Sequence, residues 1–435
     1  MRVYKPSGIK WLGEIPQSWE IKPLQAIFNQ RNEQNNNLEF QTILSLVKDV
    51  GVIPYEEKGN VGNKAKDDLQ GYKIARVNDL VLNKMNAVIG SLGVSKYDGL
   101  VSPIYLVLYI ENPNYLIAYY SYLFQTKSIQ KFLRKFAYGI MEIRESIDYL
   151  EFKKMFLPTP PLQEQKEIAE FLDSKCEKIQ NYIEKKQKLI TLLQEKKQAL
   201  INKVVTKGLN PNIESKNSGI AYLGLIPHHW EVKKLKYIVT LRNQKGNDSN
   251  FKVGLENIES QTGKYIQTNE VVFEDSGIYF YKNDILFGKL RPYLAKVFLA
   301  DKDGACVSEF LVLTPKKQCG NFLKFLTLSP LFISVVDSST YGSKMPRASW
   351  EFIGNLKIPL PPLKEQKEIA AFLDSKVAQI NSVIEKTKKQ IELIKEYKNT
   401  LINEAVCGRI ACSRDFSPTA QNDKGKATQN DKKKN

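Results

Sequence analysis

Two long stretches of the chain place apolar residues every three or four positions on a charged background. The first row consists of Ile168, Leu172, Ile179, Ile183, Ile190, Leu193, Leu200 and Val204. The second row consists of Ile369, Leu373, Ile380, Ile384, Ile391, Ile394, Leu401 and Ala405. This spacing is typical of the seam of a coiled coil. We therefore predict long helices over 161–207 and 361–408.

Proline and glycine mark the expected ends of both helices. Pro160–Pro161 and Pro361–Pro362 stand at the starts, where proline is tolerated in the first turn, and Gly208 and Gly408 stand at the ends. Each helix must bury its apolar row, and the other helix is the obvious partner. Because the first helix leads into the second domain and the second helix starts there, we predict an antiparallel pair.

The helix starts belong to a larger duplication. PPLQEQKEIAEFLDSK at 160–175 and PPLKEQKEIAAFLDSK at 361–376 differ at only two positions. SGIKWLGEIPQSWEIKPL at 7–24 recurs as SGIAYLGLIPHHWEVKKL at 218–235, and its tryptophans are expected to pack into the domains. Weaker repeats lie between: NDLVLNK and NDILFGK, and a Tyr-Gly pair with arginine five residues after the glycine. The order is the same in both halves, which indicates an internal repeat.

Between the repeated segments the two bodies differ and are predicted to be mixed α/β. YLVLYI at 105–110 and EFLVLT at 309–314 favour strands, whereas 114–126 and 321–336 favour helices. The expected fold class is α+β: two mixed α/β domains separated by two long antiparallel coiled-coil helices, with a pseudo-twofold internal repeat. The expected segments are domain 1 at 1–160, helix 1 at 161–207, a linker at 208–220, domain 2 at 221–360, helix 2 at 361–408 and a disordered polar tail at 409–435.

The net charge of the chain indicates a class of binding partner. The chain carries 64 Lys+Arg against 47 Asp+Glu, a formal net charge of +17, which favours a polyanion such as nucleic acid. Five cysteines form no C-x-x-C pair, and the only histidines are the adjacent His228 and His229, so ligands for a zinc site are lacking. No apolar run approaches the roughly 18 residues of a membrane span. We expect a cytoplasmic protein without a membrane partner.

Catalytic motifs are incomplete. NPNY at 112–115 lacks the second proline of an adenine methyltransferase N-P-P-Y loop, and the other half has no counterpart. Asp49 with Glu56 and Lys58 imitates a D…E-x-K nuclease site, but the second half has no equivalent E-x-K. No G-x-x-x-x-G-K-[ST] phosphate loop is present. We expect no catalytic residue, no metal site and no cofactor in this chain.

The helix starts repeat polar as well as apolar letters. A coiled coil requires only the apolar seam, so the repeated polar residues suggest that both copies present one face to two molecules of one partner. The predicted docking residues are Glu164, Gln165, Glu167, Asp173, Glu365, Gln366, Glu368 and Asp374.

The chain resembles the specificity subunit of type I restriction–modification systems over residues 7–410. The resemblance rests on four elements that occur twice in the same order: W/Y-L-G-x-I-P-x-x-W-E, an N-D strand, a Tyr-Gly loop and a P-P-L-x-E-Q helix. The resemblance implies a non-catalytic reader of double-stranded DNA, in which each domain reads one half of a bipartite asymmetric site. It also implies helices that set the gap and dock two adenine methyltransferase subunits, with two motor-nuclease subunits joining for cleavage. S-adenosylmethionine, ATP and magnesium would belong to those partners.

Basic and amide side chains beside the internal repeats are the candidates for DNA contact. Arginine can hold guanine and asparagine adenine through two hydrogen bonds, whereas lysine more often meets phosphate. The candidates are Asn83, Lys84, Asn86, Tyr138, Arg144, Lys289, Arg291, Tyr341, Lys344 and Arg347. Two alternatives stay open: a coiled-coil scaffold that assembles protein partners without reading DNA, and a reader that serves a fused methyltransferase-nuclease.

Overall fold

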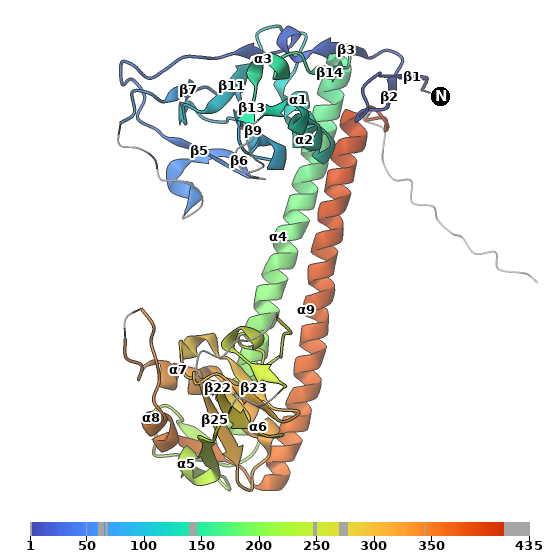
Figure 1. Cartoon of the computed structure of the whole chain (residues 1–435). Coiled ribbons are helices and arrows are strands. Elements are labelled where there is room, and N and C mark those ends of the chain that lie inside the picture. The colour runs from blue at the N-terminus through green and yellow to red at the C-terminus, as the bar shows by residue number, and fades with distance from the viewer. Residues whose placement is uncertain are drawn as a thin grey trace, which may run out of the picture. The chain divides into compact units, whose positions relative to one another are not determined.

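The computed structural model describes residues 2–48, 50–59, 65, 68–138, 146–246, 250–268, 277–342 and 344–412. The chain divides into two compact units. Unit 1 combines Met1–Glu184 with Ile391–Asn435, and unit 2 is Lys185–Gln390 (Figure 1). Each long helix therefore contributes one part to each unit.

Unit 1 contains short strands and three short α-helices besides its parts of the long helices. Its described strands are β1 Tyr4–Pro6, β2 Glu14–Pro16, β3 Glu20–Pro23, β4 Asn29–Gln30, β5 Leu44–Val47, β6 Gly51–Pro54, β7 Lys73–Ala75, β8 Leu80–Asn83, β9 Leu92–Val94, β10 Gly99–Val101, β11 Tyr105–Tyr109, β12 Ala137–Tyr138, β13 Ser146–Ile147 and β14 Phe156–Thr159. Its short helices are α1 Ile117–Gln125, α2 Lys127–Leu133 and α3 Tyr149–Phe152, and its 3-10 turns are η1 Leu24–Ala26, η2 Tyr55–Lys58, η3 Ala87–Ile89 and η4 Arg134–Phe136.

Unit 2 repeats most of this order with other residues. Its described strands are β15 Ser215–Asn217, β16 Leu225–Pro227, β17 Glu231–Lys234, β18 Val239–Arg242, β19 Lys245–Gly246, β20 Lys252–Val253, β21 Gly277–Phe280, β22 Ile285–Gly288, β23 Val297–Leu299, β24 Gly304–Cys306, β25 Phe310–Pro315 and β26 Lys357–Leu360. Its short helices are α5 Leu235–Ile238, α6 Gly320–Leu328, α7 Pro330–Asp337 and α8 Trp350–Asn355, with 3-10 turns η5 Leu255–Asn257 and η6 Pro292–Leu294.

A four-stranded antiparallel sheet is common to both units. Its order is β4-β11-β8-β9 in unit 1 and β18-β25-β22-β23 in unit 2. In both units the strand before the body pairs with the strand that leads into the long helix, β3 with β14 and β17 with β26. The hairpins β1-β2 and β15-β16 also correspond. Elsewhere in the bodies, unit 2 has a second four-stranded sheet, β19-β21-β24-β20, whereas unit 1 has the pairs β7-β10 and β5-β6, with single bridges from Gln34 to Lys73 and from Ile43 to Leu100.

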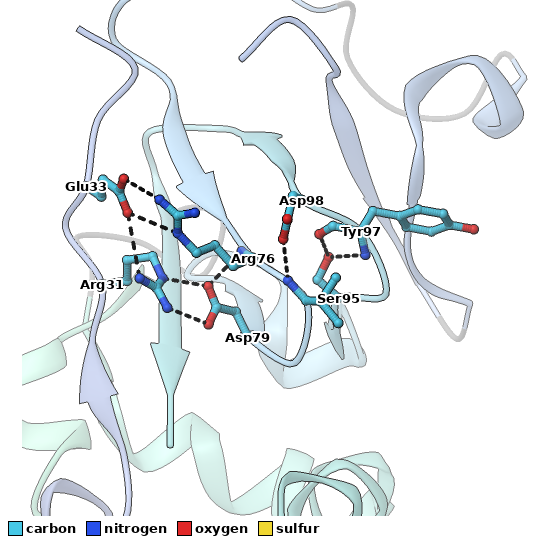
Figure 2. A network of polar contacts seen from close by, with 8 residues as sticks. Arg31, Glu33, Arg76, Asp79, Ser95, Tyr97 and Asp98 are labelled. Carbon is cyan, nitrogen blue, oxygen red and sulfur yellow. Dashed lines mark hydrogen bonds and ion pairs between the residues drawn. The ribbon is translucent and has the colours of Figure 1, made fainter. Parts of the chain in front are cut away.

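The repeated residues Asn-Asp form the same turn in both units, with an exposed asparagine and a buried aspartate. Asn78 and Asn283 adopt positive φ angles of 71° and 72°, a conformation that asparagine tolerates better than most residues. The next residue, Asp79, is buried and accepts hydrogen bonds from Arg31 Nε at 2.7 Å and from the Arg76 backbone N–H at 2.8 Å (Figure 2). The hydrogen bond with Asp79 raises the pKa of Arg31.

The second copy of this turn repeats the contacts. Asp284 is buried and accepts from Arg242 Nε at 2.9 Å and from the Tyr281 backbone N–H at 2.8 Å. A bidentate or charge-assisted contact of this kind is stronger than a neutral hydrogen bond. The turn therefore fixes the start of β8 in unit 1 and of β22 in unit 2, and with it the direction of each strand.

The long helices are α4 Leu162–Lys207, with 46 residues, and α9 Leu363–Val406, with 44 (Figure 1). In unit 1 the start of α4 shares a core with the end of α9, through Ile168, Leu172, Ile402, Ala405 and Val406. In unit 2 the end of α4 shares a core with the start of α9, through Ile201, Val204, Val205, Ile369, Ala370 and Leu373. The two helices thus pair antiparallel within each unit. The predicted fold class is confirmed.

Several local predictions can be compared with these elements. The predicted strands at 105–110 and 309–314 are β11 and β25, and Trp19 and Trp230 are fully buried as expected, with Trp11 half-buried against the core. The helical prediction at 321–336 is confirmed, but the segment is not one continuous helix. It is two helices, α6 and α7, because Ser329 caps a new helix whose first residue is Pro330. Asp49, Arg144 and the tail from residue 413 lie outside the described residues.

Candidate nucleic-acid interface

Each shared sheet ends in a compact loop that carries predicted DNA-contacting residues. We call residues 83–91 in unit 1 and 288–296 in unit 2 the strand-end loops. In unit 1 the loop is closed by hydrogen bonds from the Asn83 N–H to the Ser91 carbonyl at 3.1 Å and from the Ser91 N–H to the Asn86 carbonyl at 3.0 Å. Ala87 is buried at the start of η3, so the loop is held from inside.

The strand-end loop of unit 2 has the same design. The Gly288 N–H donates to the Lys296 carbonyl at 2.9 Å, and Pro292 is buried at the start of η6. Arg291 precedes η6 with a φ of 50°, and Ala295 follows it with a φ of 47°. Positive φ angles are unfavourable for residues other than glycine, asparagine and aspartate, and such strain is frequently found at functional sites.

A second segment hydrogen-bonds to each strand-end loop. In unit 1 the Ile147 N–H of β13 donates to the Lys84 carbonyl at 3.0 Å, and β13 pairs with β12, which contains Tyr138. In unit 2 the Ala348 N–H donates to the Lys289 carbonyl at 2.9 Å, and Arg347 forms backbone bridges with both Leu290 and Tyr341. The structure therefore brings together the two repeats that the sequence places about 55 residues apart.

The predicted residues differ in how available their side chains are. Asn86, Arg291, Tyr341 and Lys344 are exposed, and Tyr341 is 65% exposed. Asn83, Lys84 and Lys289 are half-buried, and the Asn83 Oδ1 already accepts from the Met85 N–H at 3.0 Å.

Arg347 is engaged within the chain. Its guanidinium donates to Glu309 at 3.0 Å, and this hydrogen bond raises the pKa of Arg347. For Tyr138 the structure gives the backbone position in β12, and Arg144 lies outside the described residues. Contact of any of these residues with DNA stays a prediction.

Sequence reasoning missed exposed apolar side chains in the same segments. Met85 and Ile89 of the unit 1 loop are 45% and 55% exposed, and Tyr293 and Met345 of unit 2 are 47% and 48% exposed. Apolar side chains of this kind can contact the thymine methyl group in the major groove. Their sequence neighbours give no common signal, since only Met85 stands between a basic and an amide residue, Lys84 and Asn86.

The predicted docking residues have partners inside the chain. Glu164 accepts from the Trp19 indole N–H at 2.8 Å and pairs with Arg2, and Glu365 accepts from the Trp230 indole N–H at 3.0 Å. In unit 2, His229 Nε2 also lies 2.7 Å from the Glu365 carboxylate.

The repeated glutamines are buried beneath the loop that enters α1 or α6. The Gln165 Oε1 accepts from the Leu116 N–H at 2.8 Å, and its Nε2 donates to the Pro160 carbonyl at 2.8 Å. The Gln366 Oε1 accepts from the Cys319 N–H at 3.0 Å, and its Nε2 donates to the Pro361 carbonyl at 2.9 Å. Each glutamine thus joins its helix to its own body.

These contacts give a second reason for the repeated polar letters. Asp173 accepts from the Tyr122 hydroxyl at 2.5 Å, and Asp374 pairs with Lys324 at 3.2 Å. Because glutamate, glutamine and aspartate all contact their own body, their repetition does not require a partner, and the two glutamines are too buried to offer one a surface. Docking stays a prediction for the six acidic residues that keep exposed surface: Glu164, Glu167, Asp173, Glu365, Glu368 and Asp374.

Comparison with protein families adds an independent observation. The family model described as type I restriction modification DNA specificity domain matches residues 16–194 and again residues 227–393. The two matches cover most of the chain and correspond to its two halves. The chain belongs to this family.

Relatives of this specificity family match along nearly the whole chain. A putative type I restriction enzyme MjaX specificity subunit from Methanocaldococcus jannaschii is 26% identical, over 94% of this chain and 98% of that protein. A solved structure from a study of assembly and conformational transition in a type I R-M system matches 91% of this chain and 99% of its own, with a TM-score of 0.67 and 14% identity. The HsdS subunit of Thermoanaerobacter tengcongensis matches 91% and 98%, with a TM-score of 0.51 and 14% identity. At these identities the two structures support the fold alone.

The described residues were also compared with the requirements of a metal site and of a membrane-spanning helix. Across the described ranges, no group of three or more histidine, cysteine, aspartate or glutamate residues could hold a metal ion. None of the helices in that part of the chain is long and apolar enough to cross a membrane.

Proposed function

We propose that this chain is the DNA sequence-recognition subunit of a type I restriction–modification complex and carries no catalytic step itself. Each body reads one half of a bipartite, asymmetric DNA site. The helices α4 and α9 set the gap between the half-sites and dock two adenine methyltransferase subunits, and two motor-nuclease subunits join for cleavage. S-adenosylmethionine, ATP and magnesium belong to those partners.

The observation that carries the proposal is a duplicated framework with unlike loops. Both units keep the shared sheet, the N-D turn with its buried aspartate, and the hydrogen bond between strand-end loop and second segment. The residues exposed on the loops differ, with Met85, Asn86 and Ile89 in one and Arg291 and Tyr293 in the other. One chain with two equivalent but chemically different loops suits an asymmetric bipartite site, and the excess of basic residues suits phosphate contact.

The outer faces of the long helices support docking of partners. Several large apolar side chains on α4 and α9 are exposed. Leu192 and Leu393, for example, directly precede a seam residue and so lie about 100° around the helix from it. Two pairs occupy equivalent repeat positions: Tyr182 with Val383 and Leu192 with Leu393. We call Tyr182, Leu189, Leu192, Val383, Leu393 and Tyr397 the outer rows. Exposed apolar rows on a helix indicate a protein interaction surface. They are a better basis for docking than the polar residues already engaged within the chain.

Methylation sequencing tests the reader function directly. The chain is co-expressed with its adenine methyltransferase partner in a host that lacks other adenine methylation, and methylated adenines are mapped. We expect one bipartite, asymmetric motif with a fixed gap. Purified complex should bind duplexes containing that motif far more tightly than random duplexes at physiological salt, with affinity falling steeply as salt rises.

Equal affinity for motif and random duplexes would contradict the reader function and favour the scaffold alternative. A partner that is one fused methyltransferase-nuclease polypeptide would leave the reader function intact and revise only the subunit list.

Docking is tested on the outer rows. L192D and L393D should each lower co-purification of the methyltransferase, because a carboxylate would be placed in an apolar contact. T191E is the matched control, since the neighbouring exposed residue points about 100° around the helix. Retention of two methyltransferase copies by the L192D/L393D double variant would contradict docking on this face.

A further inference from the structure

The two strand-end loops can be aligned residue by residue through their hydrogen bonds. Lys84 and Lys289 each offer a backbone carbonyl to the second segment, at 3.0 and 2.9 Å. The buried residues that start η3 and η6, Ala87 and Pro292, then correspond as well. In this alignment Asn86 of unit 1 occupies the position of Arg291 in unit 2.

Both residues stand at the same structural position, the N-cap of a 3-10 turn, and both are exposed. Neither side chain makes a hydrogen bond to another described residue, and neither caps its own turn with its side chain. Their backbones are fixed instead. The Asn86 carbonyl accepts from the Ser91 N–H at 3.0 Å, and the Arg291 N–H donates to the Pro346 carbonyl at 2.7 Å. Each side chain therefore leaves a rigid loop and points its hydrogen-bonding groups outward.

The backbone at Arg291 gives a second, independent indication. Its φ of 50° is strained for arginine, and the hydrogen bond to Pro346 and the buried Pro292 hold it there. A strained residue persists where the surrounding structure determines its conformation, and such positions cluster at ligand-binding sites. Asn86 has an ordinary φ of −124°, so only the arginine copy carries this strain.

The two side chains differ in the base that each can hold. An arginine guanidinium can donate two hydrogen bonds to O6 and N7 of guanine, and an asparagine amide can bond to N6 and N7 of adenine. The surroundings differ in the same direction. Exposed Met85 and Ile89 flank Asn86 and suit a thymine methyl group, whereas Arg291 is accompanied by Tyr293 and Lys344.

We propose that Asn86 and Arg291 are equivalent specificity residues that read different bases: Asn86 an adenine in one half-site, and Arg291 a guanine in the other. This inference rests on the proposed function and goes beyond it by naming the base that each loop selects. The apolar pair beside Asn86 adds preference for A·T pairs around that adenine.

The test exchanges the two residues in the full chain, assayed with its methyltransferase partner. The variants are R291N, R291K and N86R. Asparagine tolerates a positive φ better than arginine, so R291N suits the backbone, and Asn86 has a φ that arginine adopts without strain. K317N, an exposed lysine of unit 2 outside the loop, is the control.

The readout is the ratio of methylation at the guanine-containing site to methylation at the same site with adenine in place of that guanine. R291N should lower this ratio by about 5- to 150-fold, the range for one bidentate base contact. The other half-site should stay unchanged. R291K should lose most of the preference for guanine over adenine, because a lysine ammonium cannot donate two parallel hydrogen bonds as a guanidinium does. N86R should shift the preference in the first half-site from adenine to guanine. K317N should alter the preference in neither half-site.

An R291N complex that methylates the wild-type motif at the wild-type rate overturns the assignment of Arg291. Uniform weakening on all sequences also overturns it, because that outcome marks a phosphate contact. The wild-type methylation map separates the two levels of inference. A bipartite wild-type motif upholds the proposed function whatever the variants do, and its absence removes the proposed function before the variants are considered.

Discussion

The bodies of units 1 and 2 keep the same sheet but surround it differently. Both contain the order β4-β11-β8-β9 or its equivalent, and both begin the central strand after an N-D turn with a buried aspartate. Beside this sheet unit 2 has a second four-stranded sheet in which β20 and β24 are parallel, whereas unit 1 has the pairs β7-β10 and β5-β6 with a single parallel bridge between Ile43 and Leu100. The strand-end loops differ most, with Asn86 in one and Arg291 in the other.

This comparison separates residues that hold the fold from residues that are free to vary. The repeated side-chain contacts lie at the start of the central strand or at the entry to the long helix, and the repeated backbone hydrogen bonds close the strand-end loops. The varied residues lie at the other end of the strand, on loops whose backbones are fixed by hydrogen bonds. A rigid framework with variable loops is the usual arrangement of a binding scaffold.

The largest effect should follow from breaking the framework in one unit only. D79A leaves Arg31 and the Arg76 N–H without their buried acceptor, and we expect a cost of about 4 kcal/mol, since removing one member of a buried ion pair is strongly destabilising. D284A should do the same to unit 2. Hydrogen exchange of peptides from each unit, measured in increasing urea, reports the two stabilities separately.

The matched control is D98A, whose exposed carboxylate accepts from the Val77 N–H at 2.7 Å. It should cost about 1 kcal/mol or less. Equal loss of protection in both units after D79A would show that the units do not unfold independently and would contradict this division of the chain.

The sequence was sufficient for the features that rest on periodicity or repetition. The apolar rows predicted α4 and α9, and alternating β-branched and aromatic residues predicted β11 and β25. The apolar pattern masks the division at Ser329 and Pro330, because it continues through them, although a serine followed by proline is itself a helix-start signal. The partners of Gln165 and Gln366 were also hidden, since they are backbone groups about 50 residues away.

The candidate site was predictable only in outline. The internal repeat identified the segments that contain Lys84 and Lys289. The correspondence of Asn86 with Arg291 depends on backbone hydrogen bonds, which cannot be read from the sequence. Exposure of Met85 and Tyr293 was likewise hidden, because apolar letters next to a strand are more often core residues.

A medium effect should come from the buried glutamines, and it should differ between units. Q165A removes acceptors or donors for three backbone groups, Leu116 N–H and the carbonyls of Pro160 and Asn114, whereas Q366A removes two. With about 1 kcal/mol or more per unsatisfied buried group, we expect Q165A to destabilise unit 1 by about 3 kcal/mol and Q366A to destabilise unit 2 by about 2 kcal/mol.

The same hydrogen-exchange measurement checks this order. Wild-type stability in both variants would mean that water replaces the glutamines without cost, and the repeated polar letters would again need a partner to explain them.

The smallest effect concerns Lys197, which is buried in the helix pair of unit 2 and donates to Asn381 at 3.2 Å. Burial lowers the pKa of Lys197, with Glu259 acting in the opposite direction. At pH values between that lowered pKa and 10.5, Lys197 is protonated in the unfolded chain more often than in the folded chain. The contribution of this residue to the free energy of unfolding therefore rises with pH in that range. K197M should remove the rise and stabilise unit 2 by about 1 kcal/mol at neutral pH.

Urea unfolding of wild type and K197M at pH 7 to 10 measures the difference. A variant that is less stable than wild type by more than about 1 kcal/mol would indicate that the hydrogen bond to Asn381 outweighs the desolvation of the lysine.

The central claim, that two equivalent bodies read two different half-sites, is tested most directly by making the bodies identical. Residues 20–159 of unit 1 replace residues 231–360 of unit 2, joined at the equivalent strand pairs β3-β14 and β17-β26. The helix residues that meet the graft are nearly the same in both units: Ile168 and Leu172 correspond to Ile369 and Leu373, and Ile402 to Ile201. Methylation sequencing of the grafted chain with its methyltransferase should give the first half-site twice and the second not at all. Persistence of the original asymmetric motif would contradict the claim.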